Sequence, residues 1–366
     1  MSSAASPLGP TFISSLDAFL STSDNTPQDG PAADEDRSGI HSSINRGDMI
    51  EIQGPSGCGK TQLALFLVMT TLLPSHIRFR DSSTVIREVE IGGKSQTATF
   101  VHPAPHGSPV RRLAQLMSTH VRACLLSLDL APDDRDSIVR STVIRSLGRL
   151  TVYTLPPIQR SFTTSSSSPY APLIATLHAI HRRPHPTKEL ALLIIDGIGD
   201  AFWPARAHVR PKTTRAIRGE ADLTMEDLVR AIDAVRRDVG CAVIVTNQAI
   251  WRPMERRDAG QRDNAAPVGD PFWAQHLPPP YPSPFFSSTR PTDAWPLTTH
   301  ITLLPTSLTQ IRPDVTLVEV LKPGGEGDKR ERARAAARAR GVVRRGDRAR
   351  VGEFEFVVGE GEVLSW

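Results

Sequence analysis

The residues best suited to chemistry form one glycine-rich run, Gly54-Pro55-Ser56-Gly57-Cys58-Gly59-Lys60-Thr61, followed by Gln62. The run fits the pattern G-x-x-x-x-G-K-[ST], whose backbone N–H groups surround the phosphates of a nucleotide. In that chemistry Lys60 reaches the β- and γ-phosphates, and the hydroxyl of Thr61 holds Mg²⁺. We therefore predict that residues 54–62 bind ATP and Mg²⁺. The competing interpretation is a glycine-rich turn that only caps a helix.

The segments on either side of this run have the order that a phosphate site needs. Residues 48–53 alternate in the manner of a β-strand. Residues 62–73 are largely apolar and contain neither Gly nor Pro, which predicts a helix that Pro74 ends. Glycines allow the loop between them backbone angles that are closed to other residues, and the helix N-terminus adds its positive end.

Length and composition limit the kind of protein. The 366 residues, 39% of them hydrophobic and 22% charged, can bury one large core or two smaller ones, and the 31 prolines favour one domain with long additions. The net charge of +4 permits an anionic partner without requiring one. Cys58, Cys124 and Cys241 form no C-x-x-C pair, which favours a reducing compartment over a disulfide or zinc framework. Neither a secretory leader nor an apolar membrane span is predicted.

The remaining patterns predict an α/β fold with a mostly parallel sheet sandwiched between helices. Residues 1–45 are expected to be mostly disordered, with only residues 12–20 able to pack. Residues 46–366 form one ATP-binding domain with insertions at about 249–293 and 326–350. Strands are predicted at 150–155, 190–196, 241–246, 300–304, 316–321, 353–358 and 363–366, a hairpin at 85–91 and 95–101, and helices at 109–128, 133–147, 171–182, 225–239 and 328–340.

Asp196 ends the apolar run of residues 190–195, as a carboxylate at the tip of a central parallel strand does. At that place it orients Mg²⁺, so we predict Thr61 and Asp196 as the metal residues. The competing interpretation is a strand-end turn carboxylate. Residues 196–199 also spell D-x-x-G, a GTPase signature, but no N-K-x-D follows anywhere in the chain to bind guanine.

The segments 47–62, 193–196 and 243–248 together resemble the RecA-type recombinases, and within them the eukaryotic paralogue branch. Residues 15–20 resemble the S-L-D-x-L-L entry of that family, and the short X-ray-repair cross-complementing branch, which lacks an N-terminal helical domain, is most similar. The resemblance implies a RecA-like P-loop NTPase core. It implies that Gln248 senses the γ-phosphate and that Arg112 packs on adenine, although a solvated helix face explains Arg112 equally well.

One departure from the family concerns catalysis. Active members carry a glutamate after the second core strand, yet residues 91–128 contain no Asp or Glu. Without a carboxylate base the activation of water is poor, so we expect ATP binding with weak or absent hydrolysis. The candidates for a replacement base are His102, His106 and Asp200.

The resemblance implies two DNA-contacting loops, and the first of them, after Asp196, is rich in cations. The second, from Ala249, interleaves cations with aromatic residues, a combination that suits single-stranded DNA because charge follows phosphates and rings stack on bases. The competing interpretation is an insertion that packs on its own domain or on a partner. A third basic segment, residues 329–350, could bind nucleic acid, act as a nuclear import signal or be a solvated helix. The predicted DNA contacts are Arg206, Arg210, Lys212, Arg215 and Arg218 in the first segment, and Trp251, Arg252, Arg256 and Arg257 in the second.

The resemblance implies a nuclear protein that assists homologous-recombination repair of DNA double-strand breaks. Its expected partners are other recombinase paralogues, the main recombinase, and single-stranded or branched DNA, with no membrane. Two alternatives remain open at this point. One is a competent DNA-dependent ATPase of the same family, and the other is an unrelated P-loop NTPase such as a small-molecule kinase.

Overall fold

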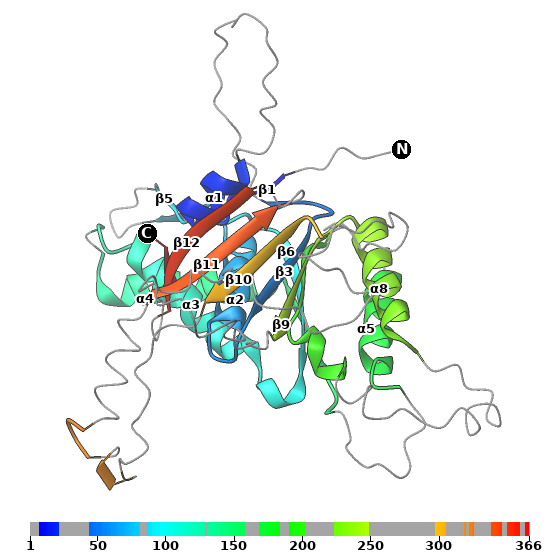
Figure 1. Ribbon diagram of the computed structural model, residues 1–366. Coiled ribbons are helices and arrows are strands. Elements are labelled where there is room, and N and C mark those ends of the chain that lie inside the picture. Colours follow the sequence, from blue (N-terminus) through cyan, green and yellow to red (C-terminus); the bar gives the residue numbers. More distant parts are fainter. Residues whose placement is uncertain are drawn as a thin grey trace, which may run out of the picture.

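The computed structural model describes residues 7–21, 44–80, 86–128, 130–157, 168–183, 190–202, 223–248, 297–304, 316, 318–319, 322–325, 338–345, 350–358 and 363–365. Within these ranges the chain has the α/β architecture that the sequence predicts, a mostly parallel sheet flanked by helices (Figure 1). None of the described helices is long and apolar enough to span a membrane.

The main sheet has nine strands in the order β13-β12-β11-β10-β3-β9-β8-β6-β7. Every neighbouring pair from β10 to β7 is parallel, whereas the three pairs from β10 to β13 are antiparallel. The strands are β3 (Met49–Gly54), β6 (Thr97–Pro103), β7 (Leu150–Leu155), β8 (Leu190–Ile195), β9 (Ala242–Gln248), β10 (Thr299–Leu304), β11 (Arg338–Arg345), β12 (Arg350–Val358) and β13 (Val363–Ser365).

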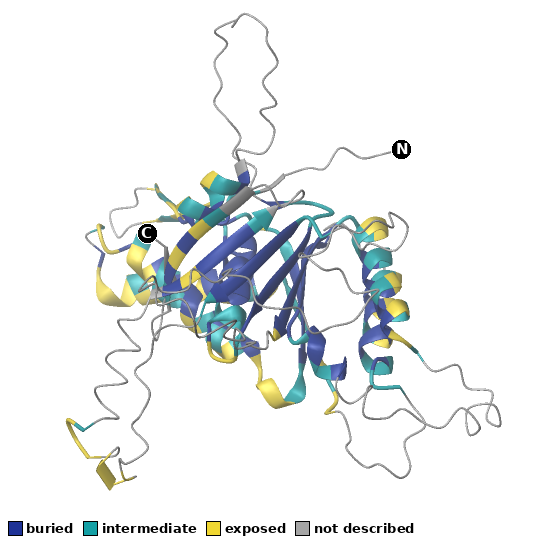
Figure 2. Cartoon of the chain, viewed as in Figure 1, coloured by how far each residue is buried: buried dark blue, intermediate teal, exposed yellow. Residues whose placement is uncertain are grey.

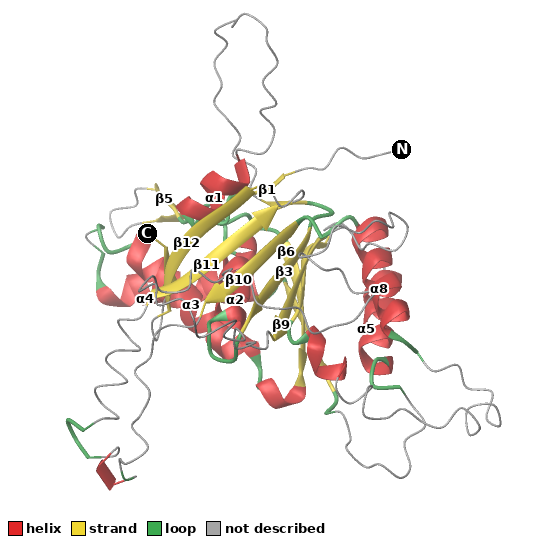
Figure 3. Ribbon diagram, viewed as in Figure 1, coloured by secondary structure: helices red, strands yellow, loops and turns green. Residues whose placement is uncertain are grey.

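Helices cover both faces of the parallel strands (Figure 3). On one face lie α2 (Lys60–Leu72), α3 (Pro109–Cys124) and α4 (Pro132–Leu147), whose apolar side chains join Ile50 and Ile52 in one core cluster. On the other face α5 (Ala171–Arg182) and α8 (Met225–Ala234) join Leu193 and Val243 in a second cluster. The central strands are therefore buried on both sides (Figure 2), which explains their continuous apolar runs.

The N-terminal segment contributes to the core through α1 (Ser14–Ser21), which overlaps the stretch 12–20 that the sequence predicts to pack. Ile13, Leu16 and Leu20 are buried in the cluster that holds α2, and α1 contacts β12. The carboxylate of Asp17 accepts hydrogen bonds from the backbone N–H groups of Thr11 and Phe12, 2.7 and 2.9 Å away, which fixes the start of the helix. A short pair, β1 (Pro7–Gly9) and β2 (Ile44–Asn45), joins this segment to the domain, and residues 22–43 lie outside the described ranges.

The hairpin prediction at 85–91 and 95–101 is wrong. Strand β5 (Ile86–Glu90) pairs instead with β4 (His76–Arg80) in a separate two-stranded sheet, and β6 runs parallel to β7 and β8 in the main sheet. Gly92 has a φ of 80°, as a turn residue should, but Phe100 and its neighbours are buried rather than alternating. Burial of β6 between two parallel strands therefore outweighs the local turn signal.

Two predictions toward the C-terminus are also wrong. The predicted strand 316–321 contains helical residues at 318–319, and the carboxylate of Glu319 accepts hydrogen bonds from the backbone N–H and hydroxyl of Thr316. The predicted helix 328–340 is contradicted at its C-terminal end, because residues 338–340 belong to β11, which pairs with β10 and β12. Ladder pairing on both sides overrides the helix propensity of the Ala-rich sequence there. Residues 326–337 lie outside the described ranges.

Candidate nucleotide and metal site

The glycine-rich loop (residues 54–61) connects the carboxyl end of β3 to the N-terminus of α2. Gly59 caps the helix with a φ of 95°, a left-handed conformation that favours glycine. At Gly54 a Cβ atom would lie 2.5 Å from the Cys58 Sγ and 2.8 Å from the carbonyl oxygen of Leu303, so no larger residue fits. The sequence pattern therefore reflects backbone shape at both positions.

The side chain of Lys60 folds back over this loop. Its Nζ donates hydrogen bonds to the carbonyl oxygens of Gly54 and Pro55, at 2.8 and 2.7 Å. The thiol of Cys58, 3.9 Å away, is buried, and burial raises its pKa. A positive charge is thus held at the mouth of the loop, next to a thiol that stays protonated.

Asp196 directly follows strand β8, and its carboxylate lies at the end of the glycine-rich loop, next to Thr61. The hydroxyl of Thr61 lies 3.1 Å from both carboxylate oxygens, and the hydroxyl of Thr246 lies 2.6 Å from Oδ1. Asp196 is only 4% exposed, so these hydroxyl contacts face little competition from water. The structure therefore brings together the two residues predicted to hold Mg²⁺, and adds Thr246, which the sequence did not single out.

Two of the candidate base residues join the same cluster. His106 is the last residue of η2 (Ala104–His106). Its Nδ1 lies 3.6 Å from Asp196 Oδ2, and its Nε2 lies 3.3 Å from Asp200 Oδ2. Asp200 lies on η3 (Ile198–Ala201), directly after β8. Burial raises the pKa of Asp200; nearby His106 opposes this shift, and Asp196 adds to it.

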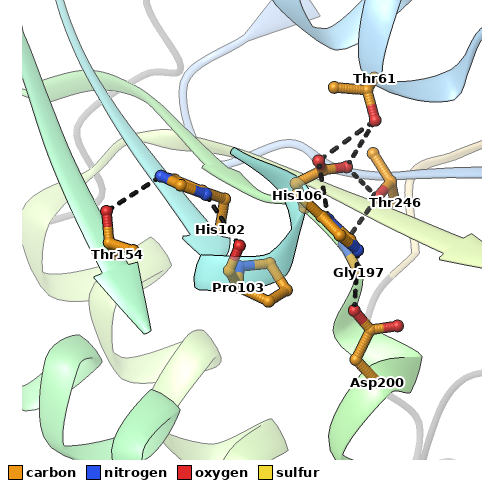
Figure 4. A network of polar contacts seen from close by, with 9 residues as sticks. Thr61, His102, Pro103, His106, Thr154, Gly197, Asp200 and Thr246 are labelled. Carbon is orange, nitrogen blue, oxygen red and sulfur yellow. Dashed lines mark hydrogen bonds and ion pairs between the residues drawn. The ribbon is translucent and has the colours of Figure 1, made fainter. Parts of the chain in front are cut away.

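The third candidate, His102, lies elsewhere. It is buried within β6, where its Nε2 is 3.1 Å from the hydroxyl of Thr154 on β7 and its Nδ1 is 3.0 Å from the carbonyl oxygen of Pro103. Figure 4 shows its ring turned toward β7 and away from Asp200. The structure therefore gives His102 a role in packing and does not bring it into the site.

The two residues with roles implied by the resemblance both adjoin the loop. The Nε of Arg112, on α3, donates to Oε1 of Gln62 in the first turn of α2, at 2.9 Å. Gln248 is exposed at the end of β9, and its Cα pairs with that of Gly54. Arg112 thus contacts the first turn of α2, and Gln248 lies beside the first residue of the loop.

The donors at Asp196 suit a small, hard cation. A carboxylate and a hydroxyl are oxygen ligands of the kind that Mg²⁺ prefers, and Mg²⁺ is held through few protein groups because it keeps several waters. The described residues contain no cluster of three or more His, Cys, Asp or Glu side chains arranged as a metal cage. This chemistry fits Mg²⁺ better than zinc.

A buried polar network links β3, the strand that leads into the loop, to its neighbours β9 and β10, and sequence reasoning missed it. The Nδ2 of Asn247 donates to Oε1 of Glu51 at 2.8 Å, and the Nε2 of His300 lies 2.9 Å from Gln53 Oε1 and 3.6 Å from Glu51 Oε2. Burial, together with the charge of Arg344, lowers the pKa of His300 to about 3. The only available signal was the polar residues within three otherwise apolar strands, and the network itself depends on the strand register.

The predicted DNA contacts lie outside the described residues. They are Arg206, Arg210, Lys212, Arg215 and Arg218 in residues 203–222, and Trp251, Arg252, Arg256 and Arg257 in residues 249–296.

Comparison with protein-family models and with curated proteins gives no match.

Proposed function

We propose that this chain is an ATP-binding paralogue of the RecA-type recombinases, with a P-loop at residues 54–61 and Mg²⁺ held through Thr61 and Asp196. It assists homologous-recombination repair of DNA double-strand breaks in the nucleus. It does so as a subunit of a complex with other recombinase paralogues, acting with the main recombinase on single-stranded or branched DNA.

The meeting of Thr61 and Asp196 is the observation that carries this proposal. Residues 135 positions apart in the chain place a hydroxyl 3.1 Å from a buried carboxylate at the mouth of a glycine-rich loop. The loop lies at the carboxyl ends of parallel strands, where open α/β sheets bind their ligands. The Lys60 ammonium and the N-terminus of α2 add positive charge for phosphates.

The order of the strands favours the recombinase branch over an unrelated kinase. Strand β9 lies between β3 and β8, so Thr246 reaches Asp196 while Gln248 lies beside Gly54. A kinase gives the end of β9 no evident role. Transfer of phosphate to a nucleoside or metabolite by the purified protein would contradict the proposal.

A DNA-dependent ATPase is the second candidate, because Asp200 supplies a carboxylate close to the site. Its Oδ2 contacts His106, which in turn contacts Asp196, and burial raises its pKa toward the range of a general base. This candidate predicts phosphate release that single-stranded DNA stimulates many-fold and that Asp200→Asn abolishes.

Nucleotide binding and turnover on one preparation test the proposal. The wild-type chain should bind a fluorescent ATP analogue with Mg²⁺, and Lys60→Ala should weaken that binding at least ~10-fold, because a charge-assisted contact to phosphate is lost. Arg140→Ala, an exposed change on α4, should bind as the wild type does and serves as the control. Unaltered affinity in Lys60→Ala would refute a phosphate role for the loop. Phosphate release by the wild-type chain that single-stranded DNA stimulates would favour the ATPase.

A further inference from the structure

We propose that Thr246 is the positioning residue of the metal site: its hydroxyl fixes the orientation of the Asp196 carboxylate and so sets the affinity for Mg²⁺. This inference rests on the proposed ATP·Mg²⁺ function and adds to it a residue on the strand that leads to Gln248.

The direction of the hydroxyl proton of Thr246 follows from its two partners. The backbone N–H of Gly197 donates to Thr246 Oγ1 at 2.8 Å, and an N–H group can only donate. The hydroxyl therefore uses its own proton toward Asp196 Oδ1, 2.6 Å away. A hydrogen bond to a carboxylate at this distance belongs to the strong, charge-assisted class.

Burial makes this contact decisive for the geometry of the carboxylate. Thr246 is 1% exposed and Asp196 is 4% exposed, so water does not replace a lost partner easily. Thr246 holds Oδ1 and His106 lies near Oδ2, while the hydroxyl of Thr61 is 3.1 Å from both oxygens. Hydrogen bonds that orient a metal ligand from behind change metal affinity by about 10–100-fold when they are removed.

The position of Thr246 in the fold gives the contact a further meaning. Thr246 lies two residues before Gln248 on β9, and its Cα pairs with that of Ile52 on β3, just before the loop. The same short stretch of strand therefore contacts the carboxylate on one side and lies beside the loop on the other. A displacement of this strand end would alter the carboxylate and the loop together.

The test compares variants that differ in the hydroxyl alone. Thr246→Val keeps the shape of the side chain without its hydroxyl, and Thr246→Ser keeps the hydroxyl. Thr71→Val is the matched control, because Thr71 is also buried and its hydroxyl donates to the Leu67 carbonyl at 2.7 Å, within α2. The measurement is the Mg²⁺ concentration that half-saturates binding of a fluorescent ATP analogue, together with the affinity for the same analogue in EDTA.

We expect Thr246→Val to need at least ~10-fold more Mg²⁺ than the wild type, with its affinity in EDTA within about twofold. Thr246→Ser and Thr71→Val should need the wild-type amount. If Thr246→Val does not fold, Thr246→Ala compared with Thr246→Ser makes the same test, since that pair also differs only in the hydroxyl.

Three outcomes overturn the inference, and the last can be told apart from the first two. A wild-type Mg²⁺ requirement in Thr246→Val, or an equal loss of affinity in EDTA, refutes the positioning role while ATP binding stands. A wild-type chain that binds no nucleotide with Mg²⁺ overturns the proposed function and this inference with it.

Discussion

Replacing His300 by Gln should remove a large part of the acid sensitivity of this fold. His300 is buried on β10, and its pKa of about 3 lies far below the value of about 6.5 that an unfolded chain gives it. Between these two values the unfolded state binds a proton that the folded state does not. The stability associated with neutral His300 is therefore complete above pH 6.5 and is lost as the pH falls toward 3.

The size of this effect follows from the two pKa values. Lowering the pH from 7 to 5 should cost the wild type about 2 kcal/mol through His300 alone. Gln cannot titrate, and it can still hydrogen-bond to Gln53. All other titrating groups remain in the variant, so its loss of unfolding free energy over this interval should be smaller by about 2 kcal/mol.

Urea unfolding of wild type and variant at pH 7 and pH 5 measures this difference. His178→Gln, which changes an exposed histidine on α5, is the control and should lose as much stability as the wild type. An equal loss in wild type and His300→Gln would refute the reasoning. It would mean that Glu51, whose Oε2 is 3.6 Å from His300 Nε2, holds this histidine protonated as a buried ion pair.

Two further changes test the packing that holds the site. Thr224→Ala removes a capping box in which Thr224 and Asp227 form reciprocal hydrogen bonds at the start of α8. It should cost ~1 kcal/mol of unfolding free energy in urea titrations, whereas Thr224→Ser should stay near wild type. An equal loss in both variants would refute the cap. Gly352→Ala places a Cβ 2.3 Å from the ring of Phe19 and should lower the free energy of unfolding by ~1–3 kcal/mol. Gly148→Ala, whose Cβ meets nothing closer than 3.4 Å, is the control and should lower it clearly less. Equal melting curves for the two variants would show that α1 does not pack on β12.

The glycine-rich loop and the strands around it could be predicted because their signals are local. Glycine is required at position 54 by a close approach of neighbouring atoms and favoured at position 59 by a left-handed backbone. The apolar runs of β8 and β9 reflect burial on both faces of the sheet. The meeting of Thr61 and Asp196 could also be expected, since both follow the carboxyl ends of parallel strands.

What could not be predicted depends on which strands become neighbours. Strand β6 was assigned to a hairpin because its true partners, β7 and β8, come much later in the chain. The helix predicted at 328–340 extends into the first three residues of β11, because the Ala-rich local pattern favours a helix and only the pairing with β10 and β12 makes these residues a strand. The approach of His106 to Asp200, and the network around His300, required the order and register of the strands as well. Local propensity carries no information on either.

The contact between α1 and β12 has a consequence for how the chain folds during synthesis. Phe19 leaves the ribosome almost a whole chain length before Gly352, against which its ring lies. Likewise β3 must wait for β10 before both of its edges are paired. Contacts between such distant residues slow folding and leave apolar surface exposed in the meantime. A partially synthesised chain of this protein should therefore depend on chaperones or an early-binding partner until its last strands emerge.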